Sequence, residues 1–128
     1  MRILIDTHVL LWAQIQPKRL SPSAREMLED PQHTIVFSAV SIWEIAIKRR
    51  LRKGGFDVDP LIVLNEARST GYEELPVTAD VAASVVDLPM HHADPFDRLL
   101  IAQAMHLPAR LLTVDKQLAP YSELVTLV

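Results

Sequence analysis

The chain has 128 residues, of which 49% are hydrophobic and 23% charged, so we expect one folded domain, residues 1–128, with a proper core rather than a disordered chain. Its net charge of −3 does not indicate a globally basic nucleic-acid binder, although a local basic patch stays open. Cysteine is absent, which excludes disulfides, zinc–thiolate sites and thiol catalysis and fits a reducing compartment.

The apolar run at the N-terminus ends at an acid, Asp6, and is too short for the apolar region of a signal peptide. No apolar run approaches the roughly 20 residues that a membrane span requires. We therefore expect a cytoplasmic protein that does not enter membranes.

Short apolar runs rich in branched residues predict strands, and helical spacing with N-cap residues and prolines predicts helices. In chain order the predicted elements are a strand over 2–5, helices over 8–14 and 21–30, a strand over 34–37, helices over 42–51 and 60–70, a strand over 74–77, helices over 78–88 and from 94 onward, a strand over 109–114, a short helix over 116–118 and a strand over 124–128. Gly54 and Gly55 mark a loop. The alternation indicates an α/β fold with a mostly parallel central sheet covered on both faces.

Two acids open the helix that begins near Asp94. Asp94 suits the N-cap position and Pro95 suits the first helical position, so Asp97 falls two positions further on. Both acids could simply cap the helix and oppose its dipole. Capping alone does not explain why the chain supplies other acids at comparable places.

Those other acids are Asp6 and Asp115, which directly follow predicted strands, and Glu44, which lies one turn into a predicted helix. The carboxyl ends of parallel strands are where open α/β sheets bind ligands, so we expect these side chains to converge with Asp97. Four carboxylates at one edge would repel one another, and burial would raise their pKa values. A hard divalent cation such as Mg²⁺ or Mn²⁺ would resolve this, and it would support phosphoryl chemistry.

Other interpretations remain open for the acids. Asp6 and Asp115 are plausible N-caps, and either Ser38 or Ser41 could cap the 42–51 helix. Ser41 with Glu44 spells a capping box. If all the acids are caps, the chain is a non-enzymatic α/β binding protein without a divalent-cation site. A phospho-acceptor signalling domain would usually have an acid pair after its first strand, and a dehalogenase-like phosphatase would have Asp where His8 stands.

Four segments together carry a family resemblance. They are Ile3-Leu4-Ile5-Asp6-Thr7-His8 with Leu10-Leu11-Trp12, Ser38-Ala39-Val40-Ser41-Ile42-Trp43-Glu44-Ile45, Asp94-Pro95-Phe96-Asp97-Arg98-Leu99-Leu100-Ile101-Ala102-Gln103-Ala104, and Leu111-Leu112-Thr113-Val114-Asp115. They resemble the motifs of PIN-domain proteins, and most closely those of the VapC-like toxins of bacterial toxin–antitoxin pairs.

The resemblance implies a three-layer α/β/α sandwich and an Mg²⁺- or Mn²⁺-dependent endoribonuclease that hydrolyses RNA phosphodiester bonds. It also implies a cognate antitoxin protein as a partner, and a homodimer. The implied catalytic and metal-binding residues are Asp6, Glu44, Asp97 and Asp115, and the implied supporting residues are Thr7, Ser38, Asp94 and Thr113. His8 varies in the family and receives no role.

Basic residues at the end of the 42–51 helix could hold RNA phosphates or form an ordinary solvated helix end. The candidate RNA contacts are Lys48, Arg49, Arg52 and Arg98, the last of which could equally pair with an acid. The adjacent pair His91 and His92 shows no ligand spacing, and we expect an ordinary loop there. Trp12 and Trp43 are expected in or near the core; if exposed, they would suit a groove for a partner helix.

Overall fold

The computed structural model describes residues 1–128 apart from the side chain of Lys53. Its five strands form one sheet in the order β3-β2-β1-β4-β5, and every neighbouring pair is parallel. The strands are β1 (Arg2–Ile5), β2 (Thr34–Ser38), β3 (Glu73–Leu75), β4 (Arg110–Thr113) and β5 (Val125–Leu127). All five lie within or beside the stretches that the sequence predicts.

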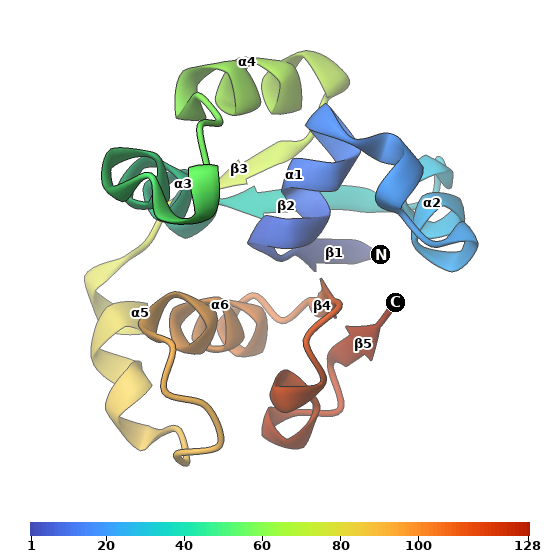
Figure 1. Ribbon diagram of the computed structural model, residues 1–128. Helices are drawn as coiled ribbons and strands as arrows, with labels where there is room; N and C mark the ends of the chain where they lie inside the picture. Colours follow the sequence, from blue (N-terminus) through green and yellow to red (C-terminus); the bar gives the residue numbers. More distant parts are fainter.

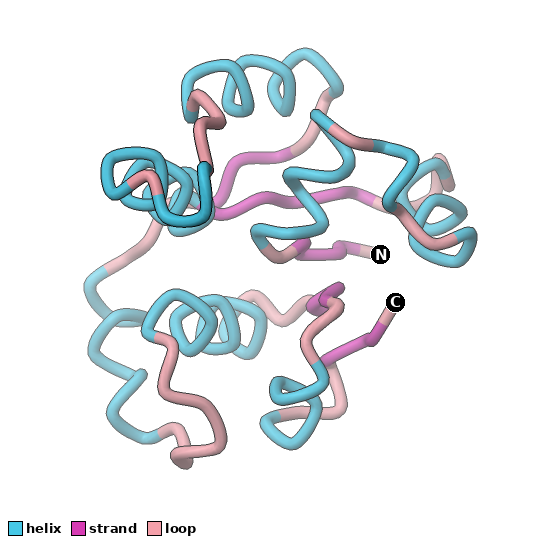
Figure 2. Tube along the Cα trace, viewed as in Figure 1, coloured by secondary structure: helices cyan, strands magenta, loops and turns pink.

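Helices cover both faces of this sheet. They are α1 (Thr7–Ile15), α2 (Pro22–Glu29), α3 (Ala39–Leu51), α4 (Pro60–Thr70), α5 (Ala79–Ser84) and α6 (Pro95–His106), with short 3₁₀ turns η1 (Pro17–Arg19), η2 (Lys53–Gly55), η3 (Val85–Asp87) and η4 (Lys116–Tyr121). In Figure 1, α4 and α6 lie on opposite sides of the sheet, and in Figure 2 the magenta strands form the middle of the trace. The predicted α/β/α sandwich with a parallel sheet is confirmed.

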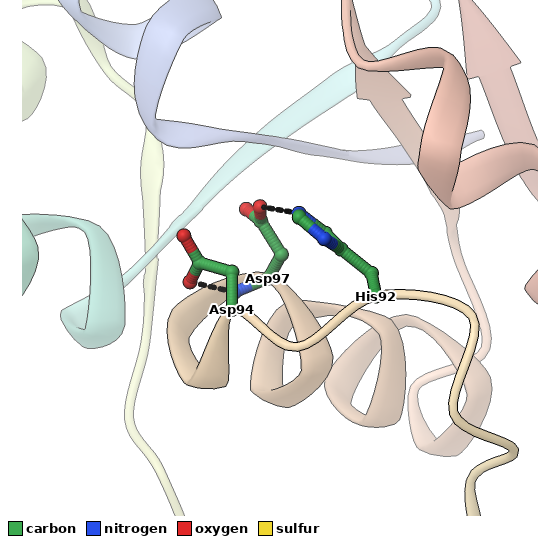
Figure 3. Close-up of side chains that lie close together, drawn as sticks. All are labelled: His92, Asp94 and Asp97. Carbon is green, nitrogen blue, oxygen red and sulfur yellow. Dashed lines mark hydrogen bonds and ion pairs between the residues drawn. The ribbon is translucent and has the colours of Figure 1, made fainter.

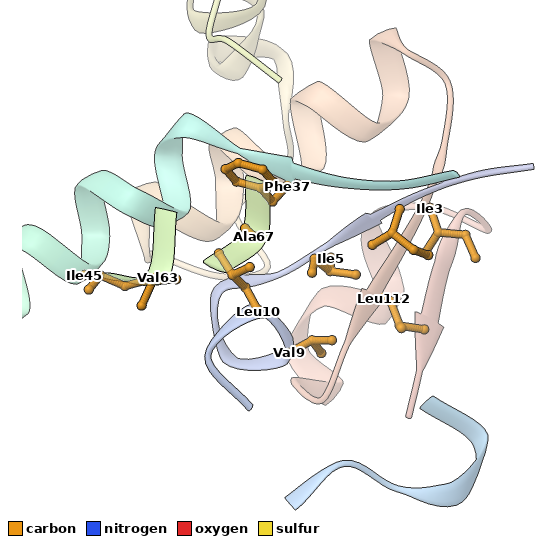
Figure 4. Close-up of a cluster of buried hydrophobic side chains, with 10 residues drawn as sticks. Ile3, Ile5, Val9, Leu10, Phe37, Ile45, Val63, Ala67 and Leu112 are labelled. Atoms are coloured by element: carbon orange, nitrogen blue, oxygen red, sulfur yellow. The ribbon is translucent and has the colours of Figure 1, made fainter. Parts of the chain in front are cut away.

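Alternate residues of β1 divide the core between the two faces. Ile3 and Ile5 pack with residues of α1 and α4, such as Leu10 and Val63 (Figure 4), whereas Leu4 packs with residues of α6 such as Leu100. This period of two is the geometry of an extended strand buried on both sides. Burying each such Leu or Ile side chain contributes about 1.5–3 kcal/mol, so the central strands are held firmly and fix where their carboxyl ends lie.

Some element boundaries differ from the prediction. Helix α3 begins at Ala39 with Ser38 as its N-cap, three residues before the predicted start. The predicted 78–88 helix is α-helical only over Ala79–Ser84 and continues as the turn η3. Gly54 and Gly55 lie in the turn η2 with φ angles of 60° and 77°, a conformation that favours glycine.

Helices in the described part of the chain are all too short or too polar to cross a membrane.

Candidate active site

Asp6 directly follows the carboxyl end of β1 and is the N-cap of α1. Its Oδ1 accepts a hydrogen bond of 2.8 Å from the Val9 amide, and its Oδ2 accepts one of 2.5 Å from the Thr113 hydroxyl. The side chain is almost fully buried. Burial raises the pKa of Asp6, the two hydrogen bonds oppose this, and Glu44 adds to it. Asp6 is therefore both a helix cap and a buried acid whose pKa is raised in part by the Glu44 carboxylate.

Glu44 faces Asp6 from the second turn of α3. Its Oε1 accepts a hydrogen bond of 2.6 Å from the Thr7 hydroxyl, and its Oε2 lies 2.6 Å from the Lys48 ammonium. Ser41 lies inside the helix, and its hydroxyl is 3.0 Å from that of Thr7. Because Ser38 is the N-cap of this helix, the capping-box interpretation of Glu44 is wrong. Glu44 is only 3% exposed, and its carboxylate contacts the Thr7 hydroxyl and the Lys48 ammonium.

Asp97 lies in the first turn of α6, three residues after the N-cap Asp94. Asp94 Oδ1 accepts hydrogen bonds from the amides of Phe96 and Asp97, at 2.8 Å and 3.2 Å, so the predicted capping role of Asp94 is confirmed. Burial raises the pKa of Asp97 to about 7, the charges of Asp94, Glu44 and Asp6 contribute to the rise, and His92 opposes it. The charge of Glu44 therefore acts on both Asp6 and Asp97, which places the three acids in one electrostatic environment.

Asp115 joins the site through a histidine. One of its carboxylate oxygens caps η4 by accepting from the Gln117 amide at 2.9 Å. The other lies 3.3 Å from His92 Nε2, which is also 3.0 Å from Asp97 Oδ2. The Asp115 amide donates a hydrogen bond of 3.0 Å to the Thr113 hydroxyl. The fourth predicted acid is therefore linked to Asp97 and Asp6 by single intervening residues.

His92 is the residue that the sequence interpretation missed. Its ring points toward Asp97 from the loop before α6 (Figure 3). Tyr121 fixes this loop: its hydroxyl accepts from the His92 amide at 2.8 Å and donates to the His92 carbonyl at 3.2 Å. The expectation of an ordinary loop is wrong here. The available signal was a histidine placed directly before a helix that opens with two acids.

The donor atoms suit a divalent cation. In the part of the chain that the structure describes, one group of ligand atoms from three residues lies within 4.8 Å, and it consists of His92, Asp94 and Asp97. The predicted quartet does not form a group that tight. Carboxylate oxygens favour Mg²⁺ or Mn²⁺, whereas an imidazole nitrogen favours softer metals. Because burial and neighbouring acids raise the pKa values of Asp6 and Asp97, a cation would relieve an excess of negative charge at this edge.

Three of the four predicted supporting residues touch the acids. Thr7 contacts Glu44, Thr113 contacts Asp6, and Asp94 holds the turn that carries Asp97. Ser38 differs, because its hydroxyl donates to Gln103 Oε1 at 2.5 Å and accepts from the Val40 amide. It anchors the start of α3 to α6 rather than an acid.

The candidate RNA-binding residues separate into two groups. Lys48 contacts Glu44, and Arg49 and Arg52 lie at the surface beside Asp57, at 3.4 Å and 2.8 Å. Arg98 requires a correction, because only 8% of it is exposed and its guanidinium donates to backbone carbonyls. The acceptors are Val85, Leu88, Pro89 and His92, together with the Tyr121 hydroxyl. Arg98 therefore holds the loop before α6 in place and does not face a substrate.

Comparisons with known proteins agree with this fold. The family model described as PIN domain matches residues 3–124. Ribonuclease VapC22 of Mycobacterium tuberculosis is 31% identical over 117 residues, covering 91% of this chain and 88% of that protein. The crystal structure of VapBC2 from Rickettsia felis bound to a DNA fragment from their promoter is similar to the whole chain, covering 98% of the matched chain, with a TM-score of 0.72 and 17% identity. The chain belongs to the PIN-domain family, and its relatives there include the VapC ribonucleases.

Proposed function

We propose that this chain, as one domain, is a divalent-metal-dependent endoribonuclease that acts as the toxin of a toxin–antitoxin pair. The observation that carries the proposal is the meeting of Asp6, Glu44 and Asp97 at the carboxyl edge of the sheet, where the pKa of Asp97 is about 7. Helix caps alone do not explain why the charge of Glu44 helps to raise the pKa values of buried Asp6 and half-buried Asp97. The similarity to Ribonuclease VapC22 supports RNA as the substrate.

The residues that would hold the cation are Asp6, Glu44 and Asp97, with Asp115 contributing from the rim. When bound, Mg²⁺ or Mn²⁺ would favour deprotonation of a water and offset negative charge on the phosphodiester. Thr7 and Thr113 orient the Glu44 and Asp6 carboxylates through their hydroxyls. His92 lies within hydrogen-bond distance of Asp97 and close to Asp115, so it is placed to exchange a proton with either carboxylate.

Lys48 is proposed to act on both Glu44 and the RNA substrate. Its ammonium lies 2.6 Å from the Glu44 carboxylate and offsets the negative charge there. Since the Lys48 side chain is partly exposed on α3 beside the acids, its ammonium would also be within reach of an RNA phosphate bound at the site. Arg49 and Arg52 extend the same positive surface and stay candidate phosphate contacts.

The remaining parts of the proposal concern partners and location. We propose a cognate antitoxin protein as the partner that blocks the site, a homodimer as the assembly, and the cytoplasm as the compartment. The family resemblance of the four acidic segments supports these assignments.

The test is cleavage of an end-labelled pool of cellular RNA by the purified chain, freed of any partner. Reactions contain Mg²⁺, Mn²⁺ or a chelator, and compare the natural chain with Asp97→Asn and with Asp87→Asn, an exposed acid outside the site. We expect cutting that requires the cation, is abolished in Asp97→Asn and persists in Asp87→Asn. Cutting that survives both the chelator and Asp97→Asn would contradict the proposal.

A further inference from the structure

A pocket of about 310 Å³ opens beside the acids, between the first helix and the end of α3. Its lining includes Thr7, His8 and Trp12 from α1, Arg19 from η1, Lys48 from α3, and Phe56. In Figure 1, α1 and α3 lie near the carboxyl end of β2. The nuclease chemistry proposed above leaves the aromatic part of this pocket without a role.

Flat rings and a cation gather on one side of the pocket. The rings of His8 and Trp12 have centroids 6.0 Å apart and are tilted by 57°. The Arg19 guanidinium lies 4.8 Å from the centroid of the Trp12 ring, which is a cation–π arrangement. His8 and Arg19 are exposed and Trp12 is half-buried. The exposed faces of these rings are therefore not used up in core packing, and a planar ligand could stack on them.

The charge of the pocket is opposite to that of the whole chain. Arg19 supplies positive charge, Lys48 adds an ammonium that also pairs with Glu44, and none of the lining residues that the structure describes is an acid, although the net charge of the chain is −3. A ligand that carries phosphate groups is complementary to this rim.

The pocket is continuous with the acidic site, because two residues belong to both. Thr7 donates its hydroxyl to Glu44, and the Lys48 ammonium lies 2.6 Å from the same carboxylate. An RNA strand with one phosphate at the acids therefore passes the mouth of the pocket with an adjacent nucleotide.

We infer that this pocket receives a nucleobase of the RNA substrate, stacked on His8 and Trp12, next to the phosphodiester that is cut. The inference rests on the proposed ribonuclease function. Single-stranded RNA is typically bound by stacking splayed bases on aromatic rings and arginine planes while cations follow the backbone. The pocket volume is at the lower end of the range for small-ligand sites, about 300–1,000 Å³, which suits one base with part of its sugar. A polypeptide segment would not require an acid-free cationic rim.

The test measures RNA binding rather than cleavage. The background variant carries Asp97→Asn to prevent cutting and Trp43→Phe, which leaves Trp12 as the remaining tryptophan of the two in the chain. Its emission is followed as short single-stranded RNA of mixed sequence is added in Mg²⁺, and then as an oligomer of the same length without bases is added. We expect saturable quenching by RNA, and at least about five-fold weaker binding of the abasic oligomer, since one stacked base is worth about 1–3 kcal/mol.

Side-chain variants then locate the binding. Anisotropy of labelled RNA should show at least about five-fold weaker binding for His8→Ala and for Trp12→Leu, and an unchanged affinity for Arg110→Ala, an exposed cation at the start of β4. Because His8 is exposed, its variant tests the inference even if Trp12→Leu folds poorly. In the cleavage-competent chain, His8→Ala should raise KM more than it lowers kcat.

Three results would overturn the inference. If the natural chain cuts RNA but His8→Ala and Trp12→Leu bind it as tightly as the background variant does, the pocket is not a base site and the nuclease proposal stands. If these variants instead lose only a protein partner, the pocket serves a polypeptide. Absence of metal-dependent cutting by the natural chain would remove the nuclease proposal itself, and the pocket inference with it.

Discussion

Replacing Asp97 by asparagine should stabilise the metal-free protein at neutral and higher pH. The Asp97 side chain is only 19% exposed, and burial with neighbouring acids raises its pKa to about 7. The protein therefore keeps an acid in a place where its charge is unfavourable. An amide of nearly the same shape removes that charge and leaves the first turn of α6 unchanged.

The size and sign of the effect follow from proton linkage. The folded pKa of about 7 exceeds the ordinary value of 3.8, so the folded chain holds the proton more tightly than the unfolded chain. The stabilising contribution of that proton is complete below about pH 4 and is lost as the pH rises through 7. At about 1.36 kcal/mol per pH unit the full loss is on the order of 4 kcal/mol. Because the side chain keeps some exposure and the substitution weakens its contact with His92, we expect Asp97→Asn to be more stable by about 2 kcal/mol at about pH 8.

The assay is urea unfolding of both proteins between about pH 4 and pH 8 with a chelator present. The difference in free energy of unfolding should be near zero at the acidic end, grow between about pH 4 and pH 7, and level off above about pH 7. Glu66→Gln, an exposed carboxylate on α4, should change stability by only a few tenths of a kcal/mol. Adding Mn²⁺ should stabilise the natural chain and not the variant. A variant that is less stable at pH 8, or a difference that does not vary with pH, would refute this reasoning.

Further predictions concern the residues around the acids. Thr113→Val should lower the free energy of unfolding by about 1–3 kcal/mol and weaken Mn²⁺ binding, because it removes the hydroxyl that donates to buried Asp6; Thr113→Ser should restore both in unfolding and calorimetric titrations. Arg98→Met should destabilise by about 2–4 kcal/mol in urea unfolding, because it removes the guanidinium that donates to the carbonyls of Leu88 and Pro89, whereas Arg110→Met should have little effect. Apparent Mn²⁺ affinity should rise by up to about ten-fold per pH unit below about pH 7, because Asp97 must lose its proton; an affinity independent of pH between about 5.5 and 7 would contradict this.

Local signals in the sequence were sufficient to predict most of the elements. Ser21 before Pro22 and Asp94 before Pro95 each begin a helix in the structure, and in both the side chain accepts from amides of the first turn. The apolar runs of β1 and β4 likewise identified the strands that Asp6 and Asp115 follow. These features depend on residues close together in the chain, so they can be predicted without knowledge of packing.

Features that depend on tertiary contacts were not predictable in this way. Ser38 and Ser41 are equally good caps by residue type, and the contact of Ser38 with Gln103, 65 residues away, accompanies the earlier start of α3. Arg98 and His92 could be assigned only once the loop before α6 was seen to fold back over that helix. Tyr121, 29 residues beyond His92, holds this loop, and no local spacing connects the two.

The most direct test of the account is the position of Mn²⁺ in a crystal of this protein, located by its anomalous scattering. We expect an ion at the carboxyl edge of the sheet with oxygen ligands from at least two of Asp6, Glu44 and Asp97. An ion bound only by His92, Asp94 and Asp97 would move the centre to the loop before α6. No ion at this edge at saturating Mn²⁺ would contradict the central claim that these acids form a metal-dependent catalytic site.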